Sequence, residues 1–171
     1  MQKLILEDLN GTDDHIRLLF KLFQQKQKSE RISSSVNLSF EEHCKFVSEH
    51  PYRYWLLVKI GDKYIGTVNI SYQNSIGIQL FEDYRTYFKT LINQVLETFD
   101  PLTALPSVRS SDFIINVSPN DTCLERELQK MGAKCIQKTF ILNPRPWNAT
   151  RQLVYNKIGI YIKELFNNHQ I

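Results

Sequence analysis

The sequence has little of what marks a secreted, disulfide-bonded or membrane-spanning protein. Only three of its 171 residues are cysteine, at positions 44, 123 and 135. An odd number without paired spacing argues against a disulfide framework, and none of the three has the spacing of metal ligands. No window holds about 18 consecutive apolar residues, and the N-terminus lacks the apolar run of a signal peptide. We therefore expect a cytoplasmic protein with no membrane segment.

Charge of one sign is also scarce. The chain has 21 basic and 18 acidic residues, for a net charge of +3, and they are scattered along the sequence. This balance gives no reason to expect nucleic-acid binding. With 42% apolar residues and 171 residues in all, the chain is long enough for one domain with a sizeable core.

Hydrophobic periodicity and turn residues predict eleven elements in the order β-α-α-β-β-β-α-β-α-β-α. Ser39 and Glu42 have the spacing of a capping box at the start of the second helix, and Gly61-Asp62 marks a β-hairpin. The predicted strands are 3–9, the two arms of the hairpin within 52–71, 75–81, 113–118 and 135–142, and the predicted helices are 12–26, 39–47, 83–99, 120–132 and 149–168.

This order also predicts how the sheet is built. Three strands joined by tight turns indicate an antiparallel meander, and the later β-α-β crossovers indicate parallel pairing. The expected fold class is α+β, with a mixed, mostly antiparallel central sheet and helices on both faces.

Three stretches of sequence resemble the GCN5-related N-acetyltransferase family. "DKYIGTVNIS" followed by "NSIGIQL" is similar to its central hairpin and splayed strand, and "FIINVSPNDTCLERELQKMGAKCIQKTFIL" to its last strand–helix–strand. "ISSSVNLSFEEHCKFVSEHPYRYWLLVKI" resembles a subgroup often associated with surface-sugar biosynthesis. The resemblance covers about residues 3 to 142, and we assign residues 1–142 to this domain. Residues 143–171 form a Pro-rich break and an amphipathic helix expected to pack on the same domain.

The resemblance implies that acetyl-CoA is the acyl donor. Its pantetheine arm would pair with the backbone of the fourth strand, and its pyrophosphate would lie at the N-terminus of the next helix. The residues implied to bind it are Ile76, Gly77, Ile78, Gln79, Leu80, Arg85, Thr86 and Asn120. Each of these residues can also have a purely structural role. Residues 76–80 would then be a fully paired central strand, residues 85–86 a solvated first helical turn, and residue 120 a helix N-cap.

The pyrophosphate turn departs from the family pattern Gln/Arg-x-x-Gly-x-Gly/Ala. With Arg85 at the first position, the two small positions fall on Phe88 and Thr90, Thr86 directly follows the arginine, and no glycine is present. Glycine leaves room for phosphates to reach the backbone N–H groups, so we interpret the loop as degenerate. The family's proton-donating Tyr is replaced by Leu128.

No catalytic residue is assigned from the sequence. A general base needs a carboxylate or imidazole near the amine, and Glu82, Asp83 and His43 are candidates. His43 falls on what the sequence predicts to be a polar, solvent-facing side of its helix.

Two functions remain open at this point. The first is an acetyl-CoA-dependent N-acetyltransferase acting on an amine of a small molecule, with an amino-sugar as the narrower suggestion. The alternative is a catalytically degenerate protein of the same fold that serves as a binding or structural subunit. Its partner, or a second copy in a homodimer, would contact the C-terminal helix.

Overall fold

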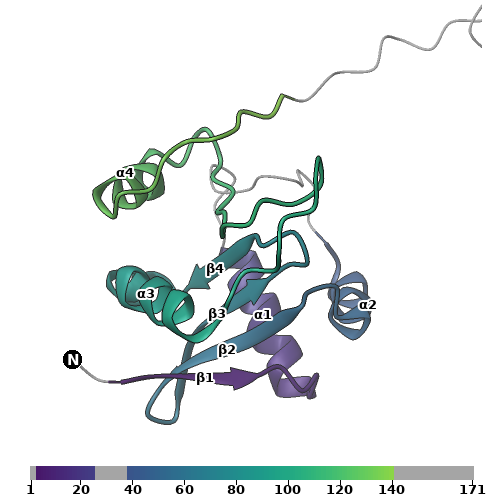
Figure 1. Cartoon of the computed structure of the whole chain (residues 1–171). Coiled ribbons are helices and arrows are strands. Elements are labelled where there is room, and N and C mark those ends of the chain that lie inside the picture. Colours follow the sequence, from purple (N-terminus) through teal and green to yellow (C-terminus); the bar gives the residue numbers. More distant parts are fainter. Residues whose placement is uncertain (1–2, 26–37, 141–171) are drawn as a thin grey trace, which may run out of the picture. The chain divides into compact units, whose positions relative to one another are not determined.

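The computed structural model describes residues 3–25 and 38–140. The chain forms two compact units, Met1–Ala133 and Lys134–Ile171, and all the helices and strands described lie in the first. Figure 1 labels them in chain order. They are β1 (Leu4–Asp8), α1 (Asp13–Gln25), α2 (Phe40–Glu49), β2 (Tyr54–Ile60), β3 (Lys63–Ile70), β4 (Ile76–Leu80), the 3₁₀ helix η2 (Glu82–Tyr87), α3 (Phe88–Thr98) and α4 (Thr122–Lys130).

The four strands form one antiparallel sheet in the order β1-β2-β3-β4. The predicted hairpin joins β2 to β3, and Gly61 at its turn has a φ of 56°, a conformation that glycine adopts without steric cost. The sheet has helices on both faces (Figure 1). The predicted α+β class and the antiparallel meander are therefore confirmed.

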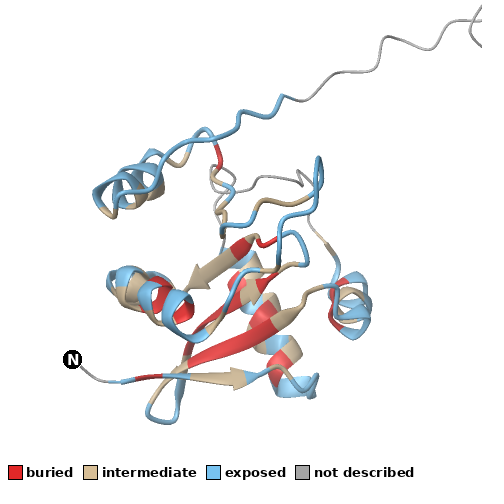
Figure 2. Ribbon diagram, in the orientation of Figure 1, coloured by how far each residue is buried: buried red, intermediate tan, exposed pale blue. Residues whose placement is uncertain are grey.

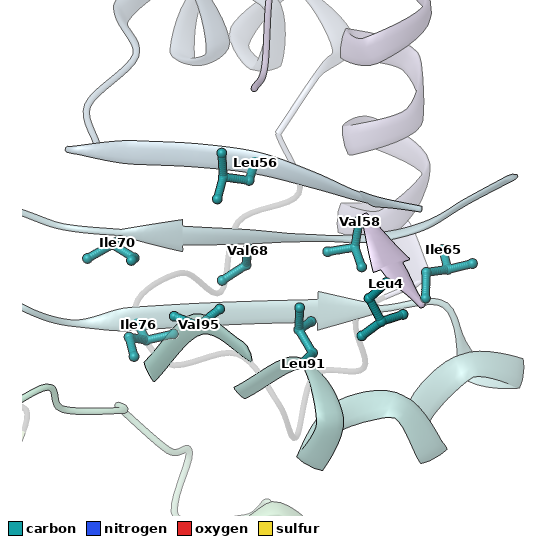
Figure 3. Packing of buried hydrophobic residues seen from close by; sticks show 9 residues of the cluster. All are labelled: Leu4, Leu56, Val58, Ile65, Val68, Ile70, Ile76, Leu91 and Val95. Atoms are coloured by element: carbon teal, nitrogen blue, oxygen red, sulfur yellow. The ribbon is translucent and has the colours of Figure 1, made fainter. Parts of the chain in front are cut away.

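Two hydrophobic clusters hold the sheet between its helices. On one face, Leu91 and Val95 of α3 lie against β-strand side chains such as Ile76 and Val68, as Figure 3 shows. On the other face, Leu22 of α1 belongs to a separate cluster that also includes α2 and β2. The buried positions concentrate on the strands and on the inward sides of these helices (Figure 2). The sheet is thus covered on both faces, and only its edges remain accessible to further pairing.

The capping box predicted for α2 is present. The Ser39 hydroxyl accepts the Glu42 N–H at 3.2 Å, and the Glu42 carboxylate accepts the Ser39 N–H at 2.7 Å. Two of the N–H groups that a helix leaves unpaired at its start are thereby satisfied.

The last predicted strands are the main difference from the sequence analysis. Residues 113–118 make only one bridge, between Ser75 and Ile114, which is parallel as predicted, and they form no regular strand. Residues 135–140 are not in a strand. A strand requires a partner backbone, and within the described part of the chain, residues 113–118 have one only at the Ser75–Ile114 bridge. The predicted break and helix of 143–171 lie outside the described residues.

Candidate functional site

In the part of the chain that the structure describes, the outer edge of β4 is paired at a single residue. The Ile76 N–H donates to the Ile114 carbonyl at 2.8 Å, on the side away from β3. Successive residues of a strand direct their N–H and C=O groups to opposite sides, so Ile78 and Leu80 direct theirs to the same side as Ile76. No hydrogen bond within the described residues engages these two N–H groups. Among residues 3–25 and 38–140, β4 is therefore an edge strand whose N–H groups at Ile78 and Leu80 have no partner, which differs from the fully paired central strand of the alternative interpretation.

The side chains of β4 point to the two faces of the sheet. Ile76, Ile78 and Leu80 belong to the cluster under α3. On the opposite face, the Gln79 side-chain Nε2 donates to the backbone carbonyl of Leu22 in α1. A Cβ on Gly77 would lie 2.7 Å from the Asn69 side-chain oxygen, so Asn69 occupies the volume that the missing side chain leaves. The backbone contact to a cofactor implied for this strand stays a prediction.

The turn after β4 is a short 3₁₀ helix that runs directly into α3, whereas the sequence predicts one helix from about residue 83. The Phe88 N–H, at the position of the family's first glycine, donates to the Arg85 carbonyl. The Arg85 guanidinium pairs with Glu82, with Nε 2.7 Å from Oε2, and Thr86 is exposed. Arg85 and Thr86 thus lie beside the start of α3. The Phe88 N–H, which would face a pyrophosphate in the family's arrangement, is instead hydrogen-bonded within the turn.

A lysine that sequence reasoning missed lies beside this turn. The Lys63 ammonium, at the start of β3, is 5.1 Å from the centre of the Tyr84 ring. A hydrogen bond with the Tyr84 side chain raises the pKa of Lys63. Tyr84 and Tyr87 are half-buried against the core, with ring centres 6.3 Å apart. The turn therefore has aromatic packing just before the positions where the family has glycine, and an exposed cation next to it.

Asn74 is a second residue that sequence reasoning missed. It lies in the turn between β3 and β4, is completely buried, and has a φ of 61°. Its side-chain Nδ2 donates to the carbonyls of Leu102 and Ser110, each at 2.8 Å, and its Oδ1 accepts the Leu102 N–H at 2.8 Å. The residue type was the one signal in the sequence, because Asn tolerates positive φ in turns. The hydrogen bonds to Leu102 and Ser110 cannot be seen in the sequence around Asn74, because these partners are distant along the chain.

Asn120 lies in the turn before α4 and is exposed. The N-cap of α4 is instead Asp121, whose carboxylate accepts the Leu124 N–H at 3.0 Å. The interpretation of Asn120 as the helix cap is therefore wrong, because the helix begins one residue later than that interpretation requires. Its contact with a cofactor stays a prediction.

His43 is buried, so its expected position on a solvent-facing side is wrong. It is 4% exposed and packs between α1 and α2, with its ring 5.3 Å from that of Phe20 and 6.3 Å from that of Phe23. Its Nε2 has no hydrogen-bond partner within the described residues. Burial lowers the pKa of the imidazole. The other candidate bases, Glu82 and Asp83, are exposed in the first turn of η2.

The burial of His43 predicts a pH dependence of stability. Its folded-state pKa is lowered, so the unfolded chain binds more protons below the ordinary value of about 6.5. The free energy of unfolding should therefore fall as the pH decreases from 7 to 5.5. We expect His43→Leu to flatten this decrease in urea titrations across that range. Phe20→Leu alters the same packing without removing a proton-binding group and should keep the parent's slope. Parallel curves for the parent and His43→Leu would refute the assignment.

Comparison with known proteins gives matches by structure and none by sequence. No protein-family model and no curated protein sequence matches the chain. An aminoglycoside N-acetyltransferase, AAC(6′)-Iy in complex with CoA, matches with a TM-score of 0.59 and 13% identity, over 85% of this chain and 97% of that one. A protein described as a possible acetyltransferase, from Clostridium difficile 630, matches with a TM-score of 0.53 and 10% identity, over 83% and 98%.

A third solved structure of similar fold has a different description. A transcriptional regulator from Bacillus halodurans C-125 matches with a TM-score of 0.52 and 11% identity, over 82% of this chain and 99% of that one. At such low identities the likeness establishes the fold, and the function has to be argued from the site.

Proposed function

We propose that this chain, which has the fold of a GCN5-related N-acetyltransferase domain, binds acetyl-CoA and transfers the acetyl group to an amine of a small molecule. The observation that carries the proposal is the open edge of β4. Ile78 and Leu80 offer N–H groups there that no other part of the described chain engages. The pantetheine arm contains amides, which can pair with such an edge as an added strand does.

The residues at this edge also fit the chemistry of acyl transfer. Attack of an amine on a thioester carbonyl places negative charge on the carbonyl oxygen, which preorganised backbone N–H groups stabilise. The N–H groups of Ile78 and Leu80 are held in place by the pairing of β4 with β3. Holding the two reactants in position supplies much of the remaining acceleration. No side chain is assigned as the general base or acid.

The phosphate contacts have to differ from the glycine-dependent pattern of the family. Phe88 stands at a position that should be small, and its N–H is engaged by Arg85. Side chains would then carry the contact, with Arg85, Thr86 and Lys63 lying beside the helix start. Asn120 is a further contact that the family resemblance implies.

The acceptor in this proposal is an amine, with an amino-sugar as its narrower form. The resemblance of residues 32–60 to a sugar-modifying subgroup supports that form. So does the aminoglycoside acetyltransferase among the solved structures of similar fold, since aminoglycosides carry amino-sugars.

One observation favours the second candidate function, a protein of this fold that no longer binds acetyl-CoA. The 3₁₀ helix satisfies the Phe88 N–H internally, and the carboxylates of Glu82 and Asp83 stand in its first turn. Carboxylates there repel phosphates at the point where a helix N-terminus would attract them. Such a protein would act as a binding or structural subunit, and the C-terminal residues proposed as its contact lie outside the described part of the chain.

Titration with acetyl-CoA, read by calorimetry and by thermal unfolding, separates the two functions. An acetyl-CoA concentration 100 times the dissociation constant should stabilise the fold by about 2.7 kcal/mol. No heat and no stabilisation at millimolar acetyl-CoA would rule out the enzyme.

The variant Phe88→Gly tests whether the aromatic ring limits phosphate binding. We expect it to tighten acetyl-CoA binding, because it opens volume at the position of the first family glycine. Asn93→Gly, at an exposed position of α3, is the matched control for the loss of helix propensity, which is less than about 1 kcal/mol in each variant. Equal affinities for Phe88→Gly and Asn93→Gly would show that the ring does not obstruct the phosphates.

A further inference from the structure

The buried amide of Asn74 holds both ends of the loop that precedes Ile114. Its two N–H groups donate to Leu102 and Ser110, and its oxygen accepts the Leu102 N–H. The side chain is fully buried, and a buried amide with these partners satisfied is held in one orientation. The Asn74 side chain therefore fixes the backbone at Leu102 and at Ser110, a few residues before Ile114.

The main chain of the same residue makes the next contact. The Asn74 carbonyl accepts the Ile114 N–H at 2.9 Å, and Ile114 in turn accepts the Ile76 N–H at 2.8 Å. In a parallel ladder the next bond would join the Asn116 N–H to the Ile76 carbonyl. That bond is not formed within the described residues. The Asn116 side chain instead donates to the Ser75 hydroxyl at 3.0 Å. Pairing therefore stops one residue after it begins.

We infer that Asn74 is a positioning residue for the acetyl-CoA site, an inference that rests on the proposed function. It holds the start of residues 113–118 against β4 at the Ser75–Ile114 bridge. This fixes that segment relative to the N–H groups of Ile78 and Leu80, which have no partner within the described residues and are free for the pantetheine arm of acetyl-CoA. Asn74 does not touch the cofactor and acts through Ile114.

Asn74→Gly removes the amide and keeps a residue that adopts a φ of 61°. Amide hydrogen exchange, read by NMR, reports the bridge through Ile76 and Ile114, with Val58 of the core as the reference. We expect exchange at Ile76 and Ile114 to accelerate at least tenfold more than exchange at Val58. We also expect the dissociation constant for acetyl-CoA to rise at least tenfold at a temperature where both proteins are folded.

Two further measurements separate positioning from a general loss of structure. Ser107→Gly alters the same loop at an exposed residue of equal φ, outside the Asn74 contacts, and should keep the parent's affinity. At acetyl-CoA concentrations that saturate each protein, Asn74→Gly should lose exchange protection at Ile78 and Leu80 while ligand-induced shifts at Arg85 and Thr86 persist. If the substitution only lowered the affinity of the whole site, saturating acetyl-CoA would restore the exchange protection at Ile78 and Leu80.

The positioning role of Asn74 is overturned if Asn74→Gly binds acetyl-CoA as tightly as the parent. It is also overturned if Ile78 and Leu80 of this variant are fully protected from exchange at saturating acetyl-CoA. If the parent binds no acetyl-CoA, the proposed function fails. In that case, the exchange rates of Ile76 and Ile114 relative to Val58 still decide whether Asn74 holds the Ser75–Ile114 bridge. Equal acceleration at Ile76, Ile114 and Val58 in Asn74→Gly would show that it does not.

Discussion

Ile78→Pro is expected to weaken acetyl-CoA binding about 100-fold, equivalent to about 2.7 kcal/mol. Proline has no N–H, so the variant deletes one of the two free donors at the open edge of β4. The same N–H takes no part in pairing with β3, and proline is tolerated in edge strands where its nitrogen faces away from the ladder. The pairing of β4 with β3 should therefore survive while the edge loses its ability to bind an added strand. Calorimetric titration with acetyl-CoA measures the change.

The matched control for this variant is Ile78→Ala. It shortens the same half-buried side chain and keeps the N–H. Its stability should fall, as expected when packed methyl groups are lost, but its affinity for acetyl-CoA should stay within about threefold of the parent, well short of the tenfold step that about 1.4 kcal/mol represents. Equal affinities for the proline and alanine variants, with both proteins folded, would show that the Ile78 N–H does not contact the cofactor.

Asn74→Asp is expected to lower the free energy of unfolding by at least about 3 kcal/mol at pH 7. The change removes both donors of the amide and turns a carboxylate toward the carbonyl oxygens of Leu102 and Ser110. Each buried polar group left without a partner costs about 1–3 kcal/mol, and a buried carboxylate adds its own desolvation. Urea denaturation at constant temperature gives the difference.

Two comparisons test the cause of that loss. Asn116→Asp changes an exposed amide nearby that makes a single hydrogen bond to the Ser75 hydroxyl, and it should cost less than about 1 kcal/mol. Burial should raise the pKa of the carboxyl group that Asn74→Asp introduces. The folded variant then binds a proton more readily than its unfolded chain does, so part of the lost stability should return as the pH falls toward 5. A loss independent of pH would contradict the account of a buried carboxylate.

The parts of the fold that sequence could predict are those set by neighbouring residues. The hairpin at Gly61-Asp62 and the capping box at Ser39 depend on residues within a few positions of one another. Residues 113–118 have the composition of a strand, but a strand forms only if another backbone lies beside it. That depends on how a distant loop is anchored, which the local pattern does not contain.

The resemblance pointed to β4 and the helix after it as the cofactor site, and that location stays a prediction. Among the described residues, the N–H groups of Ile78 and Leu80 on the outer edge of β4 have no partner. The resemblance did not indicate Asn74, whose partners lie 28 and 36 positions away. His43 was misplaced because the polar residues around it suggested a solvent-facing side, whereas packing of α2 against α1 decides its burial.

Amide hydrogen exchange of the parent protein with and without saturating acetyl-CoA tests the central claim most directly. The N–H groups of Ile78 and Leu80 face the open edge, and those of Gly77 and Gln79 face β3. The proposal predicts that acetyl-CoA slows exchange at Ile78 and Leu80 by a larger factor than at Gly77 and Gln79. The absence of binding, or binding that leaves Ile78 and Leu80 exchanging as fast as before, would contradict it.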